Sequence, residues 1–136
     1  MTVEVSAVEA ANAEFYAAFE AADLDRMQAV WDDADDVSCV HPGWAPLRGG
    51  SRIMRSWAVI FANTPYIQFF LTDVAVAVFG EVAVVTCAEN ILTAPSDSGG
   101  DATVQATNIF RRRAEGWRLW LHHGSPVVQV REAESG

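Results

Sequence analysis

The second half of the chain consists of four long runs in which apolar and polar residues alternate. These runs cover residues 66–79, 82–94, 102–113 and 117–130. Alternation with a period of two is typical of a β-strand with one buried face. Short turn sequences, Gly80-Glu81 and residues 114–116, join two pairs of these runs, and tight turns of this kind connect antiparallel strands. We therefore predict that everything after Pro65 forms an antiparallel sheet.

The first half of the chain predicts three helices. Ser6, followed three residues later by Glu9, forms a capping-box pattern at the start of the first helix. Asp23 and Ser51 can cap a short second helix and a third helix in the same way. Helices that precede a run of strands indicate an α+β domain, with three N-terminal helices packed on one face of a strongly curved antiparallel sheet. We expect one domain over residues 1–130 and a flexible tail over 131–136.

Composition excludes several classes of function. The net charge of −9 argues against nucleic acid as a partner, because phosphate binding requires a cationic surface. The chain contains no lysine, which excludes Schiff-base chemistry. It has no apolar run that could cross a bilayer and no apolar signal core, so we expect a cytoplasmic protein that does not interact with membranes. The Arg111-Arg112-Arg113 run suggests a solvated strand end more readily than an anion site.

Strict alternation assigns polar residues to the core faces of three strands. In the last strand His123 shares the face of Trp117 and Leu119, whereas His122 lies on the opposite face. In the preceding strand Asn108 is the one polar residue on the apolar face. The same argument directs His41 inward from the short strand that ends before Pro42. The pattern thus predicts that His41, Asn108 and His123 face one interior.

A few polar groups among apolar walls are typical of a small-molecule pocket. Aromatic side chains could wall such a pocket, namely Tyr16, Trp44, Trp57 and Phe61. The alternative is that each polar group is an ordinary core residue with a backbone hydrogen-bond partner. The outward residues of the last strands, Ile109, Trp120 and His122, would then form the surface of a homodimer.

Several segments resemble the NTF2-like superfamily, and in particular its SnoaL-like bacterial proteins. They are residues 15–25, the His41-Pro42-Gly43-Trp44 loop, residues 106–110 and residues 117–126. The resemblance implies a cone-shaped α+β barrel in which a curved antiparallel sheet wraps around three helices and encloses a cavity. It also implies dimerisation through the outer sheet face. The superfamily includes ketosteroid isomerases, polyketide cyclases, dehydratases and a calcium/calmodulin-dependent kinase association domain, so the fold does not settle the function.

The resemblance to the isomerases breaks down at the residues that do the chemistry. His41 stands where those enzymes have an aspartate before a proline, and Asn108 stands at the place of their neutral carboxylic acid. Their helix-borne tyrosine aligns with Phe15, and Tyr16 is one residue out of register. Steroid isomerisation is therefore not transferred to this chain.

Two classes of function remain open. In the first, His41 is a general base, Asn108 donates to a developing oxyanion and His123 protonates a leaving hydroxyl or orients the substrate. These roles suit a cofactor-free isomerase, dehydratase or polyketide cyclase-like enzyme that acts on a small hydrophobic or carbonyl-containing molecule. In the second, the chain is a non-catalytic ligand-binding or assembly module. A metal at His41 and His123 is disfavoured, because spacing places neither Asp73 nor Glu89 beside them.

Overall fold

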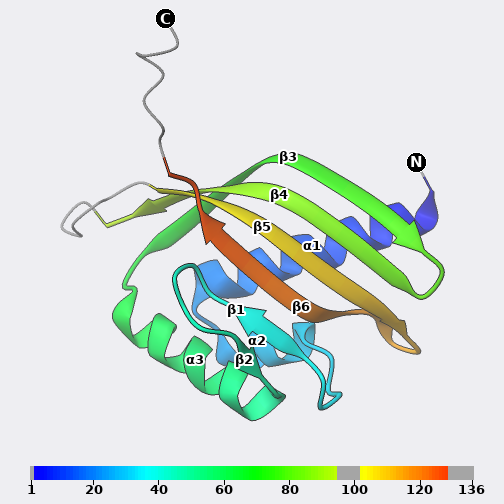
Figure 1. Cartoon of the computed structure of the whole chain (residues 1–136), viewed down its shortest axis with the longest axis horizontal. Coiled ribbons are helices and arrows are strands. Elements are labelled where there is room, and N and C mark those ends of the chain that lie inside the picture. The colour runs from blue at the N-terminus through cyan, green and yellow to red at the C-terminus, as the bar shows by residue number, and fades with distance from the viewer. Residues whose placement is uncertain (1, 95–101, 129–136) are drawn as a thin grey trace, which may run out of the picture.

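The computed structural model describes residues 2–94 and 102–128, and within them it contains three helices and six strands (Figure 1). The helices are α1 (Val3–Ala21), α2 (Leu24–Val30) and α3 (Gly50–Asn63). The strands are β1 (Ser38–Val40), β2 (Leu47–Arg48), β3 (Ile67–Phe79), β4 (Val82–Thr93), β5 (Ala102–Arg113) and β6 (Gly116–Pro126). The α+β class predicted from the sequence is confirmed. The predicted tail over 131–136 lies outside the described residues.

The helix starts agree with the sequence pattern at one of three places. Asp23 caps α2 as predicted, because its side chain accepts a hydrogen bond from a backbone N–H of the first turn. For α1 the prediction was wrong, since Thr2 rather than Ser6 provides the capping oxygen. Helix α3 follows Gly49, whose φ of 92° favours glycine, and Ser51 lies inside the helix.

The six strands form one strongly curved sheet in the order β2-β1-β6-β5-β4-β3. Strands β3 to β6 are antiparallel neighbours, as predicted, whereas β1 pairs with β6 in parallel. The sheet does not close into a barrel, and α1 lies along its concave face (Figure 1). The parallel pairing of β1 sets Val40 opposite His123 and Cys39 opposite His122. It therefore brings the end of β1, where His41 follows, beside the two histidines of β6.

A β-bulge in β6 changes which histidine faces the core. Ile109 pairs with Leu121 and the next residue of β5, Phe110, pairs with Leu119, so Trp120 is an extra residue on β6. Beyond the bulge the alternation is inverted. His122 is therefore 3% exposed in the core, and His123 points to solvent. The prediction that His123 faces inward and His122 outward was wrong, because it assumed that alternation continues through the whole strand.

The core between α1, α3 and the sheet is built mainly from aromatic rings. Phe15 of α1 contacts Trp57 of α3 edge-on, with 5.7 Å between ring centroids. Both rings are fully buried, as is Phe110 of β5. The two cysteines, Cys39 and Cys87, are buried free thiols. None of the helices in the described part of the chain is long and apolar enough to cross a membrane.

Candidate functional site

His122 is held in one orientation by Asn108 of the neighbouring strand. The distance from Nδ1 of His122 to Oδ1 of Asn108 is 2.6 Å. An amide oxygen can only accept, so Nδ1 carries the proton and Nε2 is the unprotonated nitrogen. Burial lowers the pKa of His122 to about 3, since the charged ring would lose its solvation. His122 is therefore a neutral imidazole at physiological pH.

Asn108 connects this histidine to a polar chain that crosses the interior. Its amide nitrogen donates to Oδ1 of Asn12 at 2.9 Å and to the hydroxyl oxygen of Tyr16 at 3.2 Å. The Tyr16 hydroxyl in turn donates to Oε2 of Glu89 at 2.6 Å. Both amide protons of Asn108 are therefore committed within the protein. Asn108 is buried as predicted, but this geometry makes it a residue that orients His122 rather than a free donor to an oxyanion.

Glu89 is a buried carboxyl group whose pKa lies near neutrality. It is 4% exposed, and burial raises its pKa to about 7, partly offset by the hydrogen bond from Tyr16. Burial and the neighbouring carboxyl also raise the pKa of Tyr16, so its hydroxyl stays protonated. Sequence reasoning missed Glu89 and Asn12. The alternation of β4 contained the signal for Glu89, because Val85 and Cys87 precede it on the same buried face.

His41 lies across the interior from His122 and is bound by a serine of α3. Nε2 of His41 is 2.8 Å from Oγ of Ser56, and that hydroxyl donates to the backbone carbonyl of Ile53 at 2.6 Å. Nε2 therefore carries the proton and donates to Ser56, which leaves Nδ1 unprotonated. Burial lowers the pKa of His41 to about 4, so this imidazole is also neutral at physiological pH. The predicted inward position of His41 is confirmed.

A tight turn after β1 places the ring of Trp44 against His41. The backbone N–H of Trp44 donates to the carbonyl of His41 at 2.8 Å. Pro42 fits the second position of this turn, and Gly43, with φ of 83°, fits the third position of a type II turn. The Trp44 ring meets His41 edge-on at 4.8 Å, and its side chain is 42% exposed. Trp44 is thus at the rim of the site rather than inside it.

Trp57 packs beside both histidines, and the three rings form a triangle. Its ring centroid is 4.7 Å from that of His41 and 6.3 Å from that of His122, and the two imidazoles are 6.4 Å apart. Its indole N–H is buried and has no hydrogen-bond partner within the described residues. Such a donor is rare, because a buried polar group without a partner is destabilising. Phe61 packs farther out, 5.8 Å from Trp57.

The structure therefore brings together most of the predicted residues and redistributes their roles. His41, Asn108, Tyr16 and Trp57 meet in the interior with His122, which takes the position predicted for His123. The outer-face residues Ile109 and Trp120 are half-buried, and the guanidinium of Arg111 stacks on Trp120 at 4.8 Å. Among the described residues, no three His, Cys, Asp or Glu side chains form a group that could hold a metal ion.

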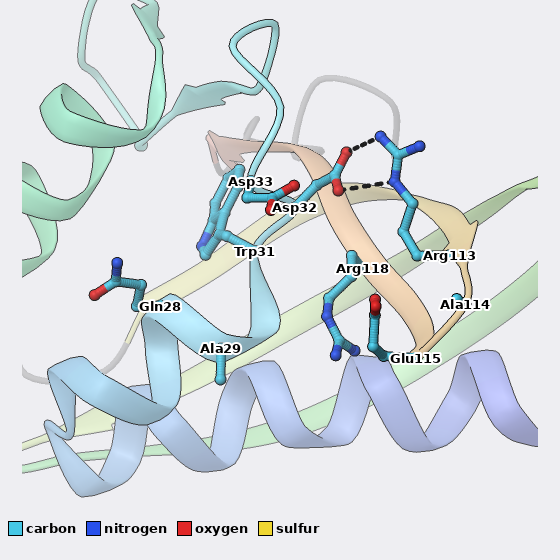
Figure 2. Close-up of a pocket in the computed structure, with 9 residues that line it drawn as sticks. All are labelled: Gln28, Ala29, Trp31, Asp32, Asp33, Arg113, Ala114, Glu115 and Arg118. Atoms are coloured by element: carbon cyan, nitrogen blue, oxygen red, sulfur yellow. Dashed lines mark hydrogen bonds and ion pairs between the residues drawn. The ribbon is translucent and has the colours of Figure 1, made fainter.

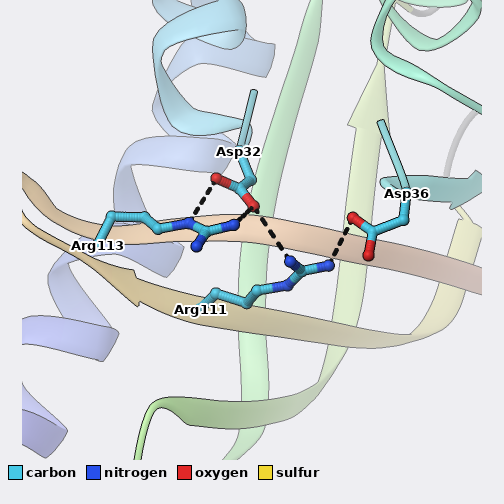
Figure 3. Close-up of polar contacts among 4 residues, drawn as sticks. All are labelled: Asp32, Asp36, Arg111 and Arg113. Atoms are coloured by element: carbon cyan, nitrogen blue, oxygen red, sulfur yellow. Dashed lines mark hydrogen bonds and ion pairs between the residues drawn. The ribbon is translucent and has the colours of Figure 1, made fainter. Parts of the chain in front are cut away.

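A large surface pocket lies elsewhere, between the end of α2 and the β5–β6 turn (Figure 2). It has a volume of about 680 Å³. On its polar wall, Nε and Nη2 of Arg113 bind the carboxylate of Asp32 at 2.9 and 2.5 Å. Arg111, which does not line the pocket, binds Asp36 at 2.6 Å (Figure 3). Arg111 and the exposed Arg113 thus fasten the segment after α2 to β5. Arg113 also lowers the pKa of Asp32 through this hydrogen bond.

Comparison with known proteins identifies the family. The SnoaL-like domain family matches residues 8–129. No curated protein has a sequence that matches this chain significantly. Among solved structures, a candidate dehydratase of the NTF2-like family from Streptomyces avermitilis is 48% identical, with a TM-score of 0.86 over 92% of this chain and 96% of its own.

Two further structures resemble the chain and concern assembly domains. A candidate calcium/calmodulin-dependent protein kinase type II association domain from Thiobacillus denitrificans is 37% identical, with a TM-score of 0.80 over 88% of this chain and 94% of its own. The CaMKII hub of S. rosetta is 22% identical, with a TM-score of 0.72 over 93% of this chain and 99% of its own, and this likeness concerns the fold alone. The chain belongs to the SnoaL-like domain family of the NTF2-like superfamily.

Proposed function

We propose that this protein binds a small carbonyl-containing molecule in its interior and transfers a proton next to the carbonyl group, as a cofactor-free dehydratase or isomerase. The observation that carries the proposal is the arrangement around Trp57. Two neutral imidazoles, His41 and His122, have ring centroids 4.7 and 6.3 Å from that of Trp57, whose buried indole N–H has no partner among the described residues. Similarity to a candidate dehydratase over nearly the whole chain supports the same class of reaction.

The roles follow from the tautomers that the hydrogen bonds select. His41 accepts the proton from the carbon next to the carbonyl, and the electron pair moves to the carbonyl oxygen to form an enolate. The N–H of Trp57 donates to that oxygen, as an oxyanion-hole donor does. The unprotonated Nε2 of His122, fixed by Asn108, accepts a hydrogen bond from a substrate hydroxyl and orients it.

The fate of the proton distinguishes the two reactions. When His41 returns it to another carbon of the enolate, the product is an isomer. When His41 delivers it to a β-hydroxyl group, that group leaves as water and an α,β-unsaturated carbonyl compound forms. An imidazole can take and release the proton in one cycle, because its two protonation states are close in energy once a polar substrate shares the site.

A panel of β-hydroxy ketones and β-hydroxy thioesters tests the proposal, because dehydration produces an enone that absorbs in the ultraviolet. We expect turnover by the wild-type protein and a loss of at least about 100-fold in His41→Ala. His123→Ala is the matched control and is expected to retain activity. Equal rates in folded His41→Ala and wild type would disprove the role of His41.

The second candidate function is assembly without catalysis. It is favoured by the 37% identity to a candidate kinase association domain and by an outer sheet face whose middle is uncharged. The middle of this face is formed by small and apolar residues of β4 and β5, namely Val84, Thr86, Ala88, Thr107 and Ile109. We propose that this face forms a homodimer, which is compatible with either function of the interior.

A further inference from the structure

A cleft between the loop after β1 and helix α3 lies next to the candidate site. Its volume is about 550 Å³. The residues that line this α3 cleft are Trp44, Leu47, Arg52, Arg55, Ser56 and Val59. Trp44 and Val59 expose 42% and 52% of their surfaces and give the cleft two apolar walls.

The cleft carries positive charge that the protein does not neutralise. Arg52 and Arg55 are exposed, and neither has an acidic partner in the described part of the chain. This differs from Arg111, Arg112 and Arg113, each of which is paired with a carboxylate. In a chain with a net charge of −9, two free guanidinium groups at one cleft form a local site for an anion.

The floor of the cleft is in direct contact with His41. Ser56 is 6% exposed and lines the cleft, and its Oγ is 2.8 Å from Nε2 of His41. Trp44 lines the same cleft and packs edge-on against His41. A molecule in the cleft is therefore one hydrogen bond away from His41. Neither His122 nor Asn108 lines the α3 cleft, which reaches His41 through Ser56 and Trp44.

We infer that the α3 cleft binds a small molecule with an oxyanion head on an apolar body. Arg52 and Arg55 hold the head, because the planar guanidinium fork matches a carboxylate or a phosphate. Trp44, Leu47 and Val59 pack against the body, and Ser56 meets the part that reaches His41. The inference rests on the proposed function, because it names the substrate class of the same site as an anionic one.

Titration with three probes that share a phenyl ring tests the inference. Benzoate and phenyl phosphate carry an oxyanion, and benzamide is their neutral counterpart. In ¹H–¹⁵N NMR spectra we expect benzoate or phenyl phosphate to shift the signals of residues 44–59 and of the His41 ring in a saturable manner. Benzamide is expected to bind at least tenfold more weakly. The tighter of the two anions identifies the head group as carboxylate or phosphate.

Two variants that remove positive charge, one inside the cleft and one away from it, separate a specific site from general electrostatics. Arg52→Gln combined with Arg55→Gln is expected to weaken binding at least tenfold, and the exposure of both side chains means that folding is retained. Arg118→Gln removes an arginine that also has no acidic partner but lines a pocket at the other end of the molecule, and is expected to change affinity less than twofold. Equal binding of benzamide, full binding by the double variant, or an equal loss in Arg118→Gln would overturn the inference.

The binding measurement tests the inference about the α3 cleft, and the activity measurement tests the proposed reaction, so each can fail without the other. If the anions bind as expected while no carbonyl compound reacts, the inference holds and the proposed reaction is wrong. If neutral carbonyl compounds react through His41 while no anion binds, the proposed reaction holds and the inference about the substrate class is wrong. A further variant, Ser56→Ala, is expected to keep anion binding but to reduce the response of the His41 ring, because it removes the contact between them.

Discussion

Burial determines the charge state of each titratable residue in the interior. It lowers the pKa of His41 to about 4 and that of His122 to about 3, and it raises the pKa of Glu89 to about 7. All three shifts favour the neutral form, as expected where charge would lose its solvation. At neutral pH the interior therefore holds two uncharged imidazoles in fixed hydrogen bonds, and a carboxyl group that is about half ionised.

Glu89→Gln tests the raised pKa of the buried carboxyl. Because the folded pKa is above the usual value of 4.5, the free energy of unfolding falls as pH rises from about 4.5 to about 7 and then levels off. The loss amounts to about 3 kcal/mol. Denaturant unfolding measures the free energy of unfolding of both proteins from pH 4.5 to 8. We expect this free energy to rise in Glu89→Gln relative to wild type as the pH increases.

The two histidines work in the opposite direction within the same pH range. Their folded pKa values lie below the usual value of 6.5, so they add stability that is lost as pH falls toward 4. Their contribution cancels when wild type and Glu89→Gln are compared at each pH. A difference between the two proteins that does not change with pH would contradict a titrating Glu89.

His122→Ala and His123→Ala form a matched pair that tests the bulge. We expect His122→Ala to lower the free energy of unfolding by about 2–4 kcal/mol, because it empties a core position and leaves Oδ1 of Asn108 without a donor. His123→Ala removes an exposed side chain and is expected to change stability by less than about 0.5 kcal/mol. Thermal and urea unfolding measure both, and equal losses would contradict the orientation of β6.

At the level of elements, two bulges shape the sheet. One inserts Trp120 into β6, and the other interrupts the pairing of β3 with β4 between Thr72 and Ala75. In the second bulge Asp73 adopts φ of 54°, a left-handed conformation that is unfavourable for most residues but open to glycine. Bulges increase the local bend of a strand, and here they help the sheet to curve around α1.

Asp73→Gly is therefore expected to stabilise the protein by about 0.5–1 kcal/mol, since glycine relieves the left-handed strain. Ala77→Gly is the control. It lies in the same strand, pairs regularly with Val84 and is expected to destabilise by about 0.5–1 kcal/mol. Both effects can be read from chemical denaturation. If both substitutions destabilise the protein, the side chain of Asp73 contributes more to the free energy of unfolding than its left-handed backbone conformation costs.

The same bulges mark the limit of what the sequence could predict. Alternation located the four long strands and directed His41 and Asn108 inward, because these residues lie in regular stretches. It failed at His122, since an inserted Trp120 is itself apolar and leaves no interruption in the pattern. The β1–β6 pairing depends on a contact between residues about 80 positions apart in the chain, and local patterns carry no information about it.

At the level of the whole molecule, the fold separates the two surfaces to which we assign different functions as proposals. The concave side of the sheet faces α1 (Figure 1), and the buried His41 and His122 lie on this side. On the convex side, small and apolar residues of β4 and β5 surround Ile109. A sheet face with an uncharged middle, on a chain with a net charge of −9, is a suitable place for a second copy to pack. Binding in the interior and assembly through the outer face can therefore coexist.

Ile109→Arg tests the proposed dimer face. In the middle of a two-fold interface, the new arginine of one subunit lies close to the same arginine of the other, and the two positive charges repel. We therefore expect dissociation to monomers without loss of the fold. Leu24→Glu, which places a charge on an exposed residue of α2, is expected to leave the assembly unchanged. Sedimentation velocity measures both variants. A dimer that persists in Ile109→Arg would exclude this face as the interface.

The central claim is that His41 and His122 form one acid–base site. Exchange of deuterium from D₂O into the carbon next to a carbonyl group tests it most directly, because isomerisation and dehydration begin with the same proton removal. Across a panel of small β-hydroxy ketones, whose hydroxyl group His122 is proposed to orient, wild type and His123→Ala are expected to catalyse exchange, while folded His41→Ala and His122→Ala lose it by at least about 100-fold. Exchange that survives in both folded interior variants, or that depends on His123, would contradict the claim.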